Sequence, residues 1–259
     1  MMHLFLSPHL DDAALSAGGL IHKLVSENQQ VVVLTFFTEY DENLTSHYLR
    51  SESNDNMNSF IKLYSKRANE DIAFCNKLSA IPIHGKILDC IYRIDQYGEP
   101  MYNNSAGIYS GLAHKSDYAS DMAQDLIDKI LLNYQPDYIY APLGIGRHVD
   151  HIIINNLVHN IKGSHKLKIL LYEDFPYVLG EYPIVNPDSL ENALLRNNKF
   201  DMRAILVDID LKEKMQNILF YDSQLEPLFG NESNLLISLE KYHRSINEIK
   251  VQERFWLIQ

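Results

Sequence analysis

The sequence predicts an α/β protein with a Rossmann-like three-layer αβα arrangement around a mostly parallel sheet. Short β-rich apolar runs alternate with stretches of helical periodicity, which is the pattern of βαβ units. A chain of 259 residues can bury a substantial core. No linker or shift in composition marks a second domain. We therefore expect a single domain over residues 1–259, with a core at about 1–175 and the strand and helices of 176–259 packed on it.

The first βαβ unit is expected from a strand at Met2–Leu6, a helix near Ala13–Ser26 and a strand at Val31–Phe37. The Asn-rich, charged region Tyr40–Asn58 predicts a loop or an irregular helix. The next helix, Lys62–Leu78, has apolar residues at helical spacing.

Strands and helices continue to alternate along the rest of the chain. Further strands are expected at Ala80–Ile83, Ile87–Ile91, Tyr138–Ala141, Leu167–Tyr172 and Arg203–Ile209. Further helices are expected at Tyr118–Asn133, Asp150–Ile161, Leu211–Ser223 and Leu235–Glu248. Irregular segments are expected at Asp95–Tyr118 and Pro176–Pro187, and Phe255 and Trp256 are interpreted as core residues near the C-terminus.

Composition excludes several classes of function. The formal net charge of −11 disfavours nonspecific binding to nucleic acid. Cys75 and Cys90 form no C-x-x-C pair and are most simply interpreted as buried thiols. No apolar stretch approaches the roughly 20 residues that span a bilayer, and Met1–Leu6 is too short for the apolar part of a signal peptide. The expectation is a cytoplasmic protein without membrane insertion.

Polar residues follow the first predicted strand in the motif Ser7-Pro8-His9-Leu10-Asp11-Asp12. Zinc accepts imidazole nitrogen and carboxylate oxygen, and a catalytic zinc usually takes three protein ligands. The motif can supply two of them. By itself it is also typical of a helix N-terminus, where carboxylates cap backbone amides.

A second motif, Gly144-Ile145-Gly146-Arg147-His148-Val149-Asp150-His151, follows the apolar run Tyr138–Leu143. By itself it could be a surface histidine at a helix start with Asp150 as the N-cap. Open α/β sheets bind ligands beyond the carboxyl ends of their strands, so the two motifs can meet there. Together they favour a metal site.

The Gly18-Gly19 pair lies inside the first predicted helix rather than before it, and no G-x-G-x-x-G follows the first strand. A dinucleotide-binding fingerprint is therefore absent. We interpret the two glycines as allowing the helix to pack closely on the sheet or on the second motif.

The two motifs together resemble the PIG-L (LmbE-like) family of zinc-dependent N-acetylglucosaminyl deacetylases. Further segments that resemble the family are Arg67-x-x-Glu70-Asp71, Tyr172-Glu173-Asp174-x-Pro176, Tyr221-x-Ser223-Gln224 and Glu253-Arg254-Phe255-Trp256. The resemblance covers nearly the whole chain. Two positions depart from the family pattern, which often has Pro at Leu10 and an acidic residue at Ala13, and the second departure could alter the surroundings of the metal ligands.

The resemblance implies that His9, Asp12 and His151 bind one Zn²⁺ per chain, although another divalent metal is possible. It also implies that Asp11 does not bind the metal and instead acts as the general base that takes a proton from a zinc-bound water. His148 is implied as a cationic donor to the oxyanion, with Asp150 orienting or charging its ring. The departing amine would receive its proton from either Asp11 or His148.

Three residues are expected to contact substrate: Arg67, Asp89 and Arg93. Arg67, Glu70 and Asp71 could equally form a solvated helix face with local ion pairs, and the resemblance favours a site-facing Arg67. Asp89 and Arg93 follow a predicted strand, where they could bond sugar hydroxyls, although a turn carboxylate and a surface arginine would look the same. Specificity is expected in the loops Thr38–Asn58, Asp95–Tyr118 and Phe175–Asn186.

The resemblance therefore implies a zinc-dependent amidohydrolase that removes an N-acetyl group from an N-acetylglucosamine-type amino sugar or its glycoside. The alternative is a catalytically silent sugar-binding or metal-binding module, and a two-metal phosphoesterase would want more ligands than the two motifs offer. The expected partner is a small-molecule amino sugar, with no nucleic acid, and the sequence indicates no particular oligomeric state.

Overall fold

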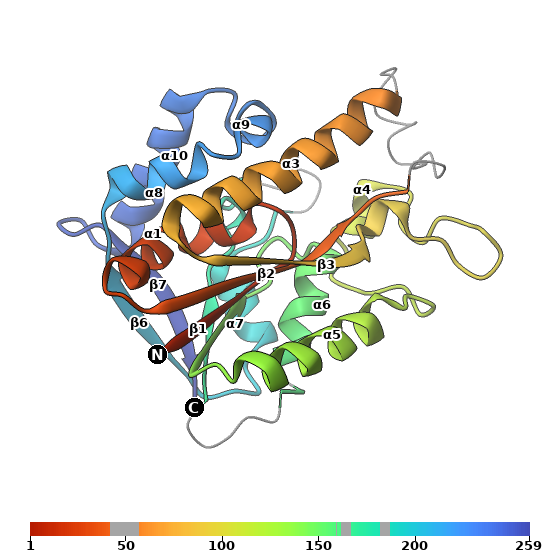
Figure 1. The fold of residues 1–259 in the computed structure, drawn as a ribbon, viewed down its shortest axis with the longest axis horizontal. Helices are drawn as coiled ribbons and strands as arrows, with labels where there is room; N and C mark the ends of the chain where they lie inside the picture. The colour runs from red at the N-terminus through yellow and green to blue at the C-terminus, as the bar shows by residue number, and fades with distance from the viewer. Residues whose placement is uncertain (42–56, 159, 162–166, 182–186) are drawn as a thin grey trace.

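The computed structural model describes residues 1–41, 57–158, 160–161, 167–181 and 187–259. Its centre is a seven-stranded sheet in the order β3-β2-β1-β4-β5-β7-β6 (Figure 1). The first five strands of that order run parallel, and β7 runs antiparallel to β5 and to β6. The strands are β1 (Met2–Ser7), β2 (Gln30–Glu39), β3 (Ile81–Leu88), β4 (Tyr138–Pro142), β5 (Lys168–Tyr172), β6 (Met202–Asp208) and β7 (Gln252–Ile258). The expected Rossmann-like, mostly parallel sheet is confirmed.

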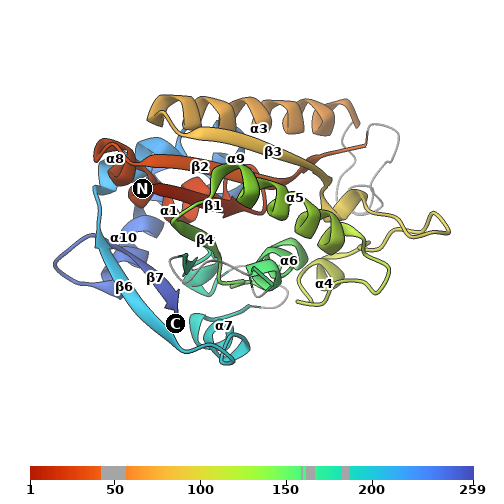
Figure 2. The same cartoon turned by 60° about the horizontal axis from the view of Figure 1, so that its bottom comes forward.

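Helices cover both faces of this sheet (Figure 2). One face packs against α5 (Ala119–Tyr134), α6 (Val149–Val158) and α7 (Leu190–Arg196), and the other against α1 (Asp12–Ser26) and α3 (Met57–Leu78). Alternation along β1 divides its side chains between the two cores, because successive residues of a strand point to opposite faces.

A third hydrophobic cluster joins α8 (Leu211–Ile218), α9 (Asp222–Phe229) and α10 (Glu232–Ile246). It also contains Leu15 of α1 and Phe175 from the segment after β5. The short elements η1 (Cys90–Tyr92), α4 (Ser105–Ile108) and η2 (Tyr177–Leu179) lie in the connections. Helices α8, α9 and α10 therefore pack against α1, the helix that begins at the first motif.

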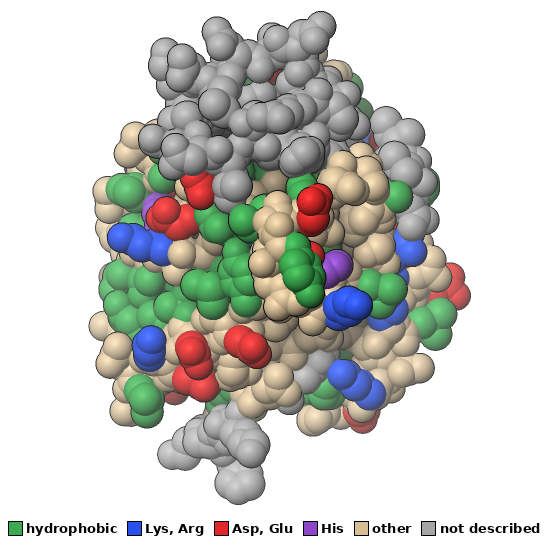
Figure 3. Space-filling model, turned by 90° about the vertical axis from the view of Figure 1, so that its right-hand side faces the viewer, with side chains coloured by type: hydrophobic (Ala, Val, Ile, Leu, Met, Phe, Trp, Pro, Cys, Tyr) green, Lys and Arg blue, Asp and Glu red, His purple; other side chains and the backbone are tan. Residues whose placement is uncertain are grey.

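The strand order places both motifs at one point of the sheet. From β1 the chain passes to β2 and β3 on one side, whereas β4 and β5 lie on the other. Such a switch opens a crevice at the carboxyl ends of the two central strands, here β1 and β4. Figure 3 views the molecule from this side, where acidic and basic side chains are interspersed among hydrophobic and uncharged ones.

Four elements differ from the sequence prediction. In place of the two strands expected at 80–83 and 87–91, the single strand β3 covers 81–88, and 90–92 form η1; the pairing of β3 with β2 shifts register at Phe37. The helix expected at 211–223 ends at Ile218 as α8, and a separate helix, α9, begins at Asp222. Helix α7 and strand β7 were not predicted. The charged residues Glu253 and Arg254 interrupt the apolar pattern of β7. The strand accommodates them because Glu253 pairs with Lys214 and Arg254 with Glu173.

Gly19 of α1 packs against β7 and against Ile209 after β6, whereas Gly18 faces Asn217 of α8, so neither glycine packs on the second motif. A Cβ on Gly19 would lie 2.5 Å from Cδ1 of Ile209 and 2.9 Å from Oε1 of Glu253. The Glu253 carboxylate accepts hydrogen bonds from the backbone N–H groups of Gly19, at 3.0 Å, and Leu20, at 2.8 Å. Only glycine therefore lets α1 approach β7 so closely.

Cys75 and Cys90 are both buried and free, as expected. Among the described residues, no helix combines the length and apolar character that crossing a bilayer requires. Most of the loop Thr38–Asn58 and the end of the loop Phe175–Asn186 lie outside the described residues.

Candidate active site

The first motif is held by capping interactions between β1 and α1. The hydroxyl of Ser7 donates to the carbonyl of His9 at 2.7 Å and accepts from the backbone N–H of Ala13, in the first turn of α1, at 3.0 Å. The Asp12 carboxylate accepts from the backbone N–H of His9 at 2.8 Å. The turn therefore directs the side chains of His9, Asp11 and Asp12 toward the crevice.

The second motif forms a glycine-rich turn that leads into α6. Gly146 has φ +88°, and a Cβ there would lie 2.2 Å from the ring of Tyr177. The Asp174 carboxylate, just after β5, accepts from the backbone N–H groups of Gly144 and Ile145 at 2.8 and 2.9 Å. These contacts fix the turn that presents His148 and the first turn of α6.

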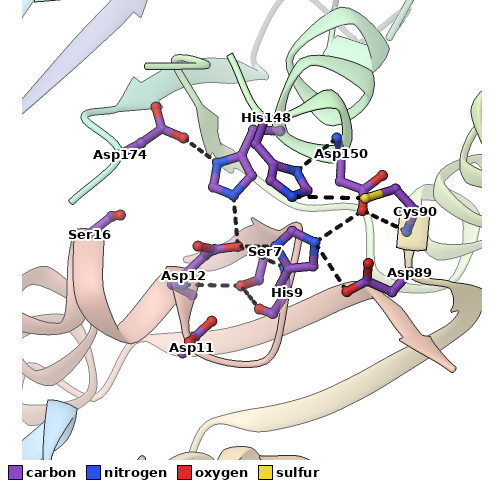
Figure 4. Close-up of polar contacts among 12 residues, drawn as sticks. Ser7, His9, Asp11, Asp12, Ser16, Asp89, Cys90, His148, Asp150 and Asp174 are labelled. Carbon is purple, nitrogen blue, oxygen red and sulfur yellow. Dashed lines mark hydrogen bonds and ion pairs between the residues drawn. The ribbon is translucent and has the colours of Figure 1, made fainter. Parts of the chain in front are cut away.

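His9 and His151 converge on one carboxylate oxygen of Asp12, and Figure 4 shows Asp12 beside the ring of His9. Oδ2 of Asp12 lies 3.2 Å from Nδ1 of His9 and 3.3 Å from Nε2 of His151. Two donor atoms on a tetrahedral zinc, at about 2.0–2.1 Å from the ion, are about 3.3–3.4 Å apart. The separations therefore match those of neighbouring metal ligands.

The opposite nitrogen of each ring contacts a carboxylate. Nε2 of His9 lies 3.0 Å from Oδ2 of Asp150, and Nδ1 of His151 lies 2.7 Å from Oδ1 of Asp174. Carboxylate partners of this kind fix the tautomer of metal-binding histidines. Within the described part of the chain, Nε2 of His151 has no hydrogen-bond partner although it is buried. A buried ring nitrogen that faces a carboxylate oxygen at 3.3 Å suits a cation.

Electrostatics also favour a cation at this position. Burial lowers the pKa of His9 and His151, but the carboxylates outweigh burial. Hydrogen bonds to Asp12 and Asp150 raise the pKa of His9 well above its usual value. Asp12 and Asp174 raise the pKa of His151 to about 9. Because the rings hold protons this firmly, the donor set fits a divalent cation that displaces them.

Among the described residues, three groupings bring potential metal-binding atoms within 4.8 Å of one another: His9 with His148 and His151, Cys90 with His148 and Asp150, and His9 with Asp89 and Asp150. His148 is a poor ligand, because the backbone N–H of Asp150 donates to its Nδ1 at 3.2 Å. In the neutral ring the proton then resides on Nε2. The better set of metal-binding residues is therefore His9, Asp12 and His151, because Asp12 contacts both histidines. None of the three groupings includes Asp12.

Asp11 stands apart from the contacts between Asp12 and the two histidines (Figure 4). Its carboxylate lies 3.2 Å from Nη2 of Arg67 on α3. Burial raises the pKa of Asp11 to about 6, although Arg67 opposes the shift. A carboxylate with such a pKa can exchange a proton near neutral pH.

The lowered pKa of His148 favours a neutral ring over the expected cationic donor. Burial, together with the nearby His9, lowers the pKa of His148 to about 3. The Asp150 side chain does not contact this ring, because its oxygens bond His9, Arg93 and the backbone N–H of Cys90. Asp150 orients His148 through its backbone N–H alone. Nε2 of His148 lies 3.9 Å from Sγ of Cys90, and in the neutral ring its N–H is a hydrogen-bond donor.

A cavity of about 240 Å³ opens above these groups. Its polar lining includes His9, Asp11, Asp12, Arg67, Asp89, His148 and Gln224. Its remaining lining is largely apolar and aromatic, and includes Tyr109, Phe175 and Tyr177. The rings of Tyr109 and Tyr177 lie 6.4 Å apart, and Tyr109 contacts His148 edge to face. The cavity therefore combines aromatic walls with a few polar groups, as small-molecule sites do.

The expected substrate contacts divide into two groups. Arg67 and Asp89 line the cavity. Arg93 does not, because its side chain is fully buried between Asp117 and Asp150. The expectation that Arg93 contacts substrate is therefore corrected, since two carboxylates hold its guanidinium away from the cavity.

Glu70 and Asp71 are buried and do not form the solvated face considered above. Glu70 accepts from the backbone N–H and the hydroxyl of Ser223, at 3.0 and 2.6 Å. Asp71 accepts from the hydroxyl of Tyr221 at 2.7 Å and contacts His84 at 2.9 Å. Helix α3 therefore fixes the start of α9, from which Gln224 reaches the cavity.

The two departures from the family pattern lie in the core. Leu10 is 1% exposed and Ala13 is 2% exposed, and Ala13 packs with α3 and the sheet. Two residues near the site to which sequence reasoning gave no role are Asp174, which contacts His151, and Asp117, which contacts Arg93. Asp174 follows a predicted strand, which is a signal that could have found it, whereas Asp117 lies in a segment expected to be irregular.

A cluster that suits a divalent cation lies at the switch point of this open α/β sheet, the position where ligands bind in such folds. Residues 4–162 match the family model described as PIG-L, GlcNAc-PI de-N-acetylase. Because this match covers more than half of the chain, the protein belongs to the PIG-L family.

Two curated relatives are 2'-N-acetylparomamine deacetylases. The Streptomyces fradiae protein is 24% identical over 86% of this chain and 73% of its own length, and the Niallia circulans protein is 24% identical over 91% and 85%. Among solved structures, a deacetylase of teicoplanin biosynthesis has a TM-score of 0.75 at 23% identity, covering 100% of this chain and 98% of its own. A teicoplanin deacetylase in a zinc-inhibited form has a TM-score of 0.73 at 22% identity, with the same coverage. The structural likeness establishes a shared fold.

Proposed function

We propose that this protein is a zinc-dependent amidohydrolase that removes the N-acetyl group from an N-acetylglucosamine-type amino sugar or its glycoside. The observation that carries the proposal is the convergence of His9 and His151 on Oδ2 of Asp12, at 3.2 and 3.3 Å. Membership of the PIG-L family supports the reaction type. The two relatives named as deacetylases of an N-acetylated aminoglycoside support the substrate class.

One zinc ion per chain would be held by Nδ1 of His9, Oδ2 of Asp12 and Nε2 of His151. The hydrogen bonds of Asp150 and Asp174 support this choice of atoms, because they place each ring proton on the opposite nitrogen. When bound, the ion supplies Lewis acidity to the amide carbonyl and lowers the pKa of water.

Asp11 acts as the general base in this proposal. Its carboxylate lines the cavity, and Arg67 at 3.2 Å keeps one oxygen in place. Burial raises its pKa to about 6, so it can accept a proton from the attacking water and hold it near neutral pH. The adjacent Asp12 is occupied by contacts with both histidines.

His148 stabilises the negative charge that develops on the former carbonyl oxygen. It does so as a neutral donor through Nε2–H, because the backbone N–H of Asp150 occupies Nδ1. A preorganised donor of this kind contributes electrostatic stabilisation without being charged itself. Tyr109 packs edge to face against the ring and supports its orientation.

Protonated Asp11 returns its proton to the departing amine. Donation by the neutral ring of His148 would leave an imidazolate in a buried site, which costs more than ionising a carboxylic acid. The products are acetate and the primary amine of the sugar. The aromatic walls at Tyr109, Phe175 and Tyr177 suit the apolar face of a sugar, and Asp89 and Arg67 are placed to bond its hydroxyls.

The reaction is tested by screening N-acetylated amino sugars and their glycosides for release of primary amine. Amine release should stop when a chelator removes the metal and return on addition of zinc. Amine release that continues in the metal-free protein would contradict the proposal. Binding of zinc and sugar without any amine release would instead identify the silent module.

The roles of the carboxylates are tested by substitution. Asp11→Asn should keep zinc and lose turnover by about 10²–10⁴-fold, as expected for loss of a general base. Asp12→Ala and His151→Ala should lose zinc as well. Asp128→Asn, exposed on α5, is the control and should change neither property. Full turnover in Asp11→Asn would show that another group is the base.

A further inference from the structure

A buried chain of ionic groups extends from the back of the site into the segment 95–118. Oδ2 of Asp150 contacts His9 at 3.0 Å, and Oδ1 of Asp150 accepts from Nη2 of Arg93. Nη1 of Arg93 donates to both oxygens of Asp117, at 3.1 and 2.9 Å. The hydroxyl of Tyr102 donates to Oδ2 of Asp117 at 2.7 Å.

These groups are removed from water. The side chains of Arg93, Asp117 and Asp150 are all 0% exposed. The guanidinium of Arg93 lies 5.1 Å from the ring centre of Phe37 and 5.3 Å from that of Tyr102. A buried charge needs a partner with good geometry, and a planar guanidinium is suited to hold carboxylates on two of its nitrogens.

We propose that Asp117 and Arg93 are positioning residues that fix the Asp150 carboxylate and, through it, the orientation of His9 as a metal ligand. This proposal rests on the proposed function, because a fixed orientation of the His9 ring matters only if His9 binds the metal. The segment 95–118, expected to set substrate specificity, would then also tune metal affinity.

Asp150 alone would not hold the ring of His9 in one orientation. A carboxylate on the first turn of α6 can rotate about its side-chain bonds. Apart from His9, its Oδ2 accepts from the backbone N–H of Cys90, at 3.3 Å, and from no other group in the described part of the chain. Arg93 holds the other oxygen, and Asp117 with two bonds holds Arg93. The remaining contacts of Asp117 anchor it to the start of α5, where the backbone N–H of Ala119 donates to Oδ1 at 2.9 Å.

The experiment compares zinc affinity in folded variants by competition with a chromophoric chelator. Asp117→Asn keeps the shape of the side chain and removes the charge that holds Arg93. We expect zinc to bind about 10- to 100-fold more weakly, the usual effect of losing a partner of a metal ligand. Tyr102→Phe, which removes one bond to Asp117, should have a smaller effect in the same direction.

The matched control is Asp95→Asn in the same segment. The Asp95 carboxylate accepts from the backbone N–H groups of Tyr97 and Glu99, whereas Arg93 donates to Asp117 and Asp150. Its substitution should leave zinc affinity unchanged. A general loosening of the segment would weaken zinc binding in Asp95→Asn as well and would overturn the assignment.

A double-mutant cycle with Asp150→Asn separates positioning from a structural role. If Asp117 acts through Asp150, its substitution should have little further effect on zinc affinity in the Asp150→Asn background. Fully additive effects would overturn the proposal. In the zinc-loaded protein, the His9 Nε2–H signal in ring-nitrogen NMR should exchange faster in Asp117→Asn than in the wild type.

The outcomes distinguish this inference from the proposed function. If the wild-type protein binds no zinc, or if His9→Ala does not weaken zinc binding, the proposed metal site is wrong. If the wild type binds zinc through His9 and Asp117→Asn binds it equally well, only the positioning role is refuted.

Discussion

Substitution of Asp174 by asparagine tests whether the orientation of His151 determines metal binding. Oδ1 of Asp174 contacts Nδ1 of His151 at 2.7 Å, while Oδ2 accepts from the backbone N–H groups of Gly144 and Ile145 at 2.8 and 2.9 Å. Asparagine has nearly the same shape but carries one oxygen and one NH₂ group. Because two backbone donors require an acceptor, the oxygen of the asparagine should stay with them, and its NH₂ group should face His151.

The expected effect follows from the tautomer of the ring. With an NH₂ group opposite Nδ1, this nitrogen must accept, so the proton of a neutral ring moves to Nε2, which faces Asp12. Zinc could then bind Nε2 only after the hydrogen bond at Nδ1 is broken. A hydrogen bond to a charged group contributes about 1.5–3 kcal/mol. Since about 1.4 kcal/mol is tenfold in affinity, zinc should bind about 10- to 100-fold more weakly.

Chelator competition measures this loss, and Asp188→Asn is the matched control. Asp188 accepts from the backbone N–H of Gly146 at 3.0 Å and pairs with Arg196. Its substitution disturbs the same turn without facing a histidine ring, and zinc affinity should change much less. Equal zinc affinity in Asp174→Asn and wild type would refute the reasoning, as would equal losses in the two variants.

Three further predictions concern protons and packing. In the metal-free protein the pKa of His151 is raised to about 9, so the ring is protonated at neutral pH and zinc must displace that proton. Zinc affinity should therefore fall as pH falls below about 9, and calorimetry in buffers of different ionisation enthalpy should detect proton release. Gly146→Ala should destabilise the fold in urea by more than Gly98→Ala. Both glycines have positive φ, costing a substituted residue about 1–2 kcal/mol, but only at Gly146 would a Cβ clash, whereas nothing lies within 4 Å at Gly98. Lys214→Met leaves the buried Glu253 without its cation and should cost about 3–5 kcal/mol in unfolding free energy, and adding Glu253→Gln should recover part of it.

The parts of the fold that could be predicted are those with local periodicity. The first βαβ unit and α5 were placed within a residue or two, because each carries an apolar pattern within its own sequence. Strand β7 could not be found this way. Glu253 is fully buried in β7 because Lys214 neutralises it, and these two residues lie 39 positions apart. A sequence pattern records the charge of Glu253 but not its partner.

In the candidate site too, some features follow from the local sequence and others depend on contacts between distant residues. The sequence predicts that His9, Asp12 and His151 lie together, because their motifs follow two neighbouring parallel strands whose carboxyl ends share one edge of the sheet. The neutral state of His148 could not be predicted, since it depends on burial and on the backbone N–H of Asp150.

Short motifs can supply metal donors, but they do not decide which nitrogen of a histidine faces the metal. That choice depends on the second nitrogen, which for His9 contacts Asp150 and for His151 contacts Asp174. Asp174 follows β5 and therefore lies at the same edge of the sheet as the candidate ligands. Asp117 does not follow a strand, and it reaches His9 only through Arg93 and Asp150. Changes in the segment 95–118 could therefore alter metal affinity even where both motifs are intact.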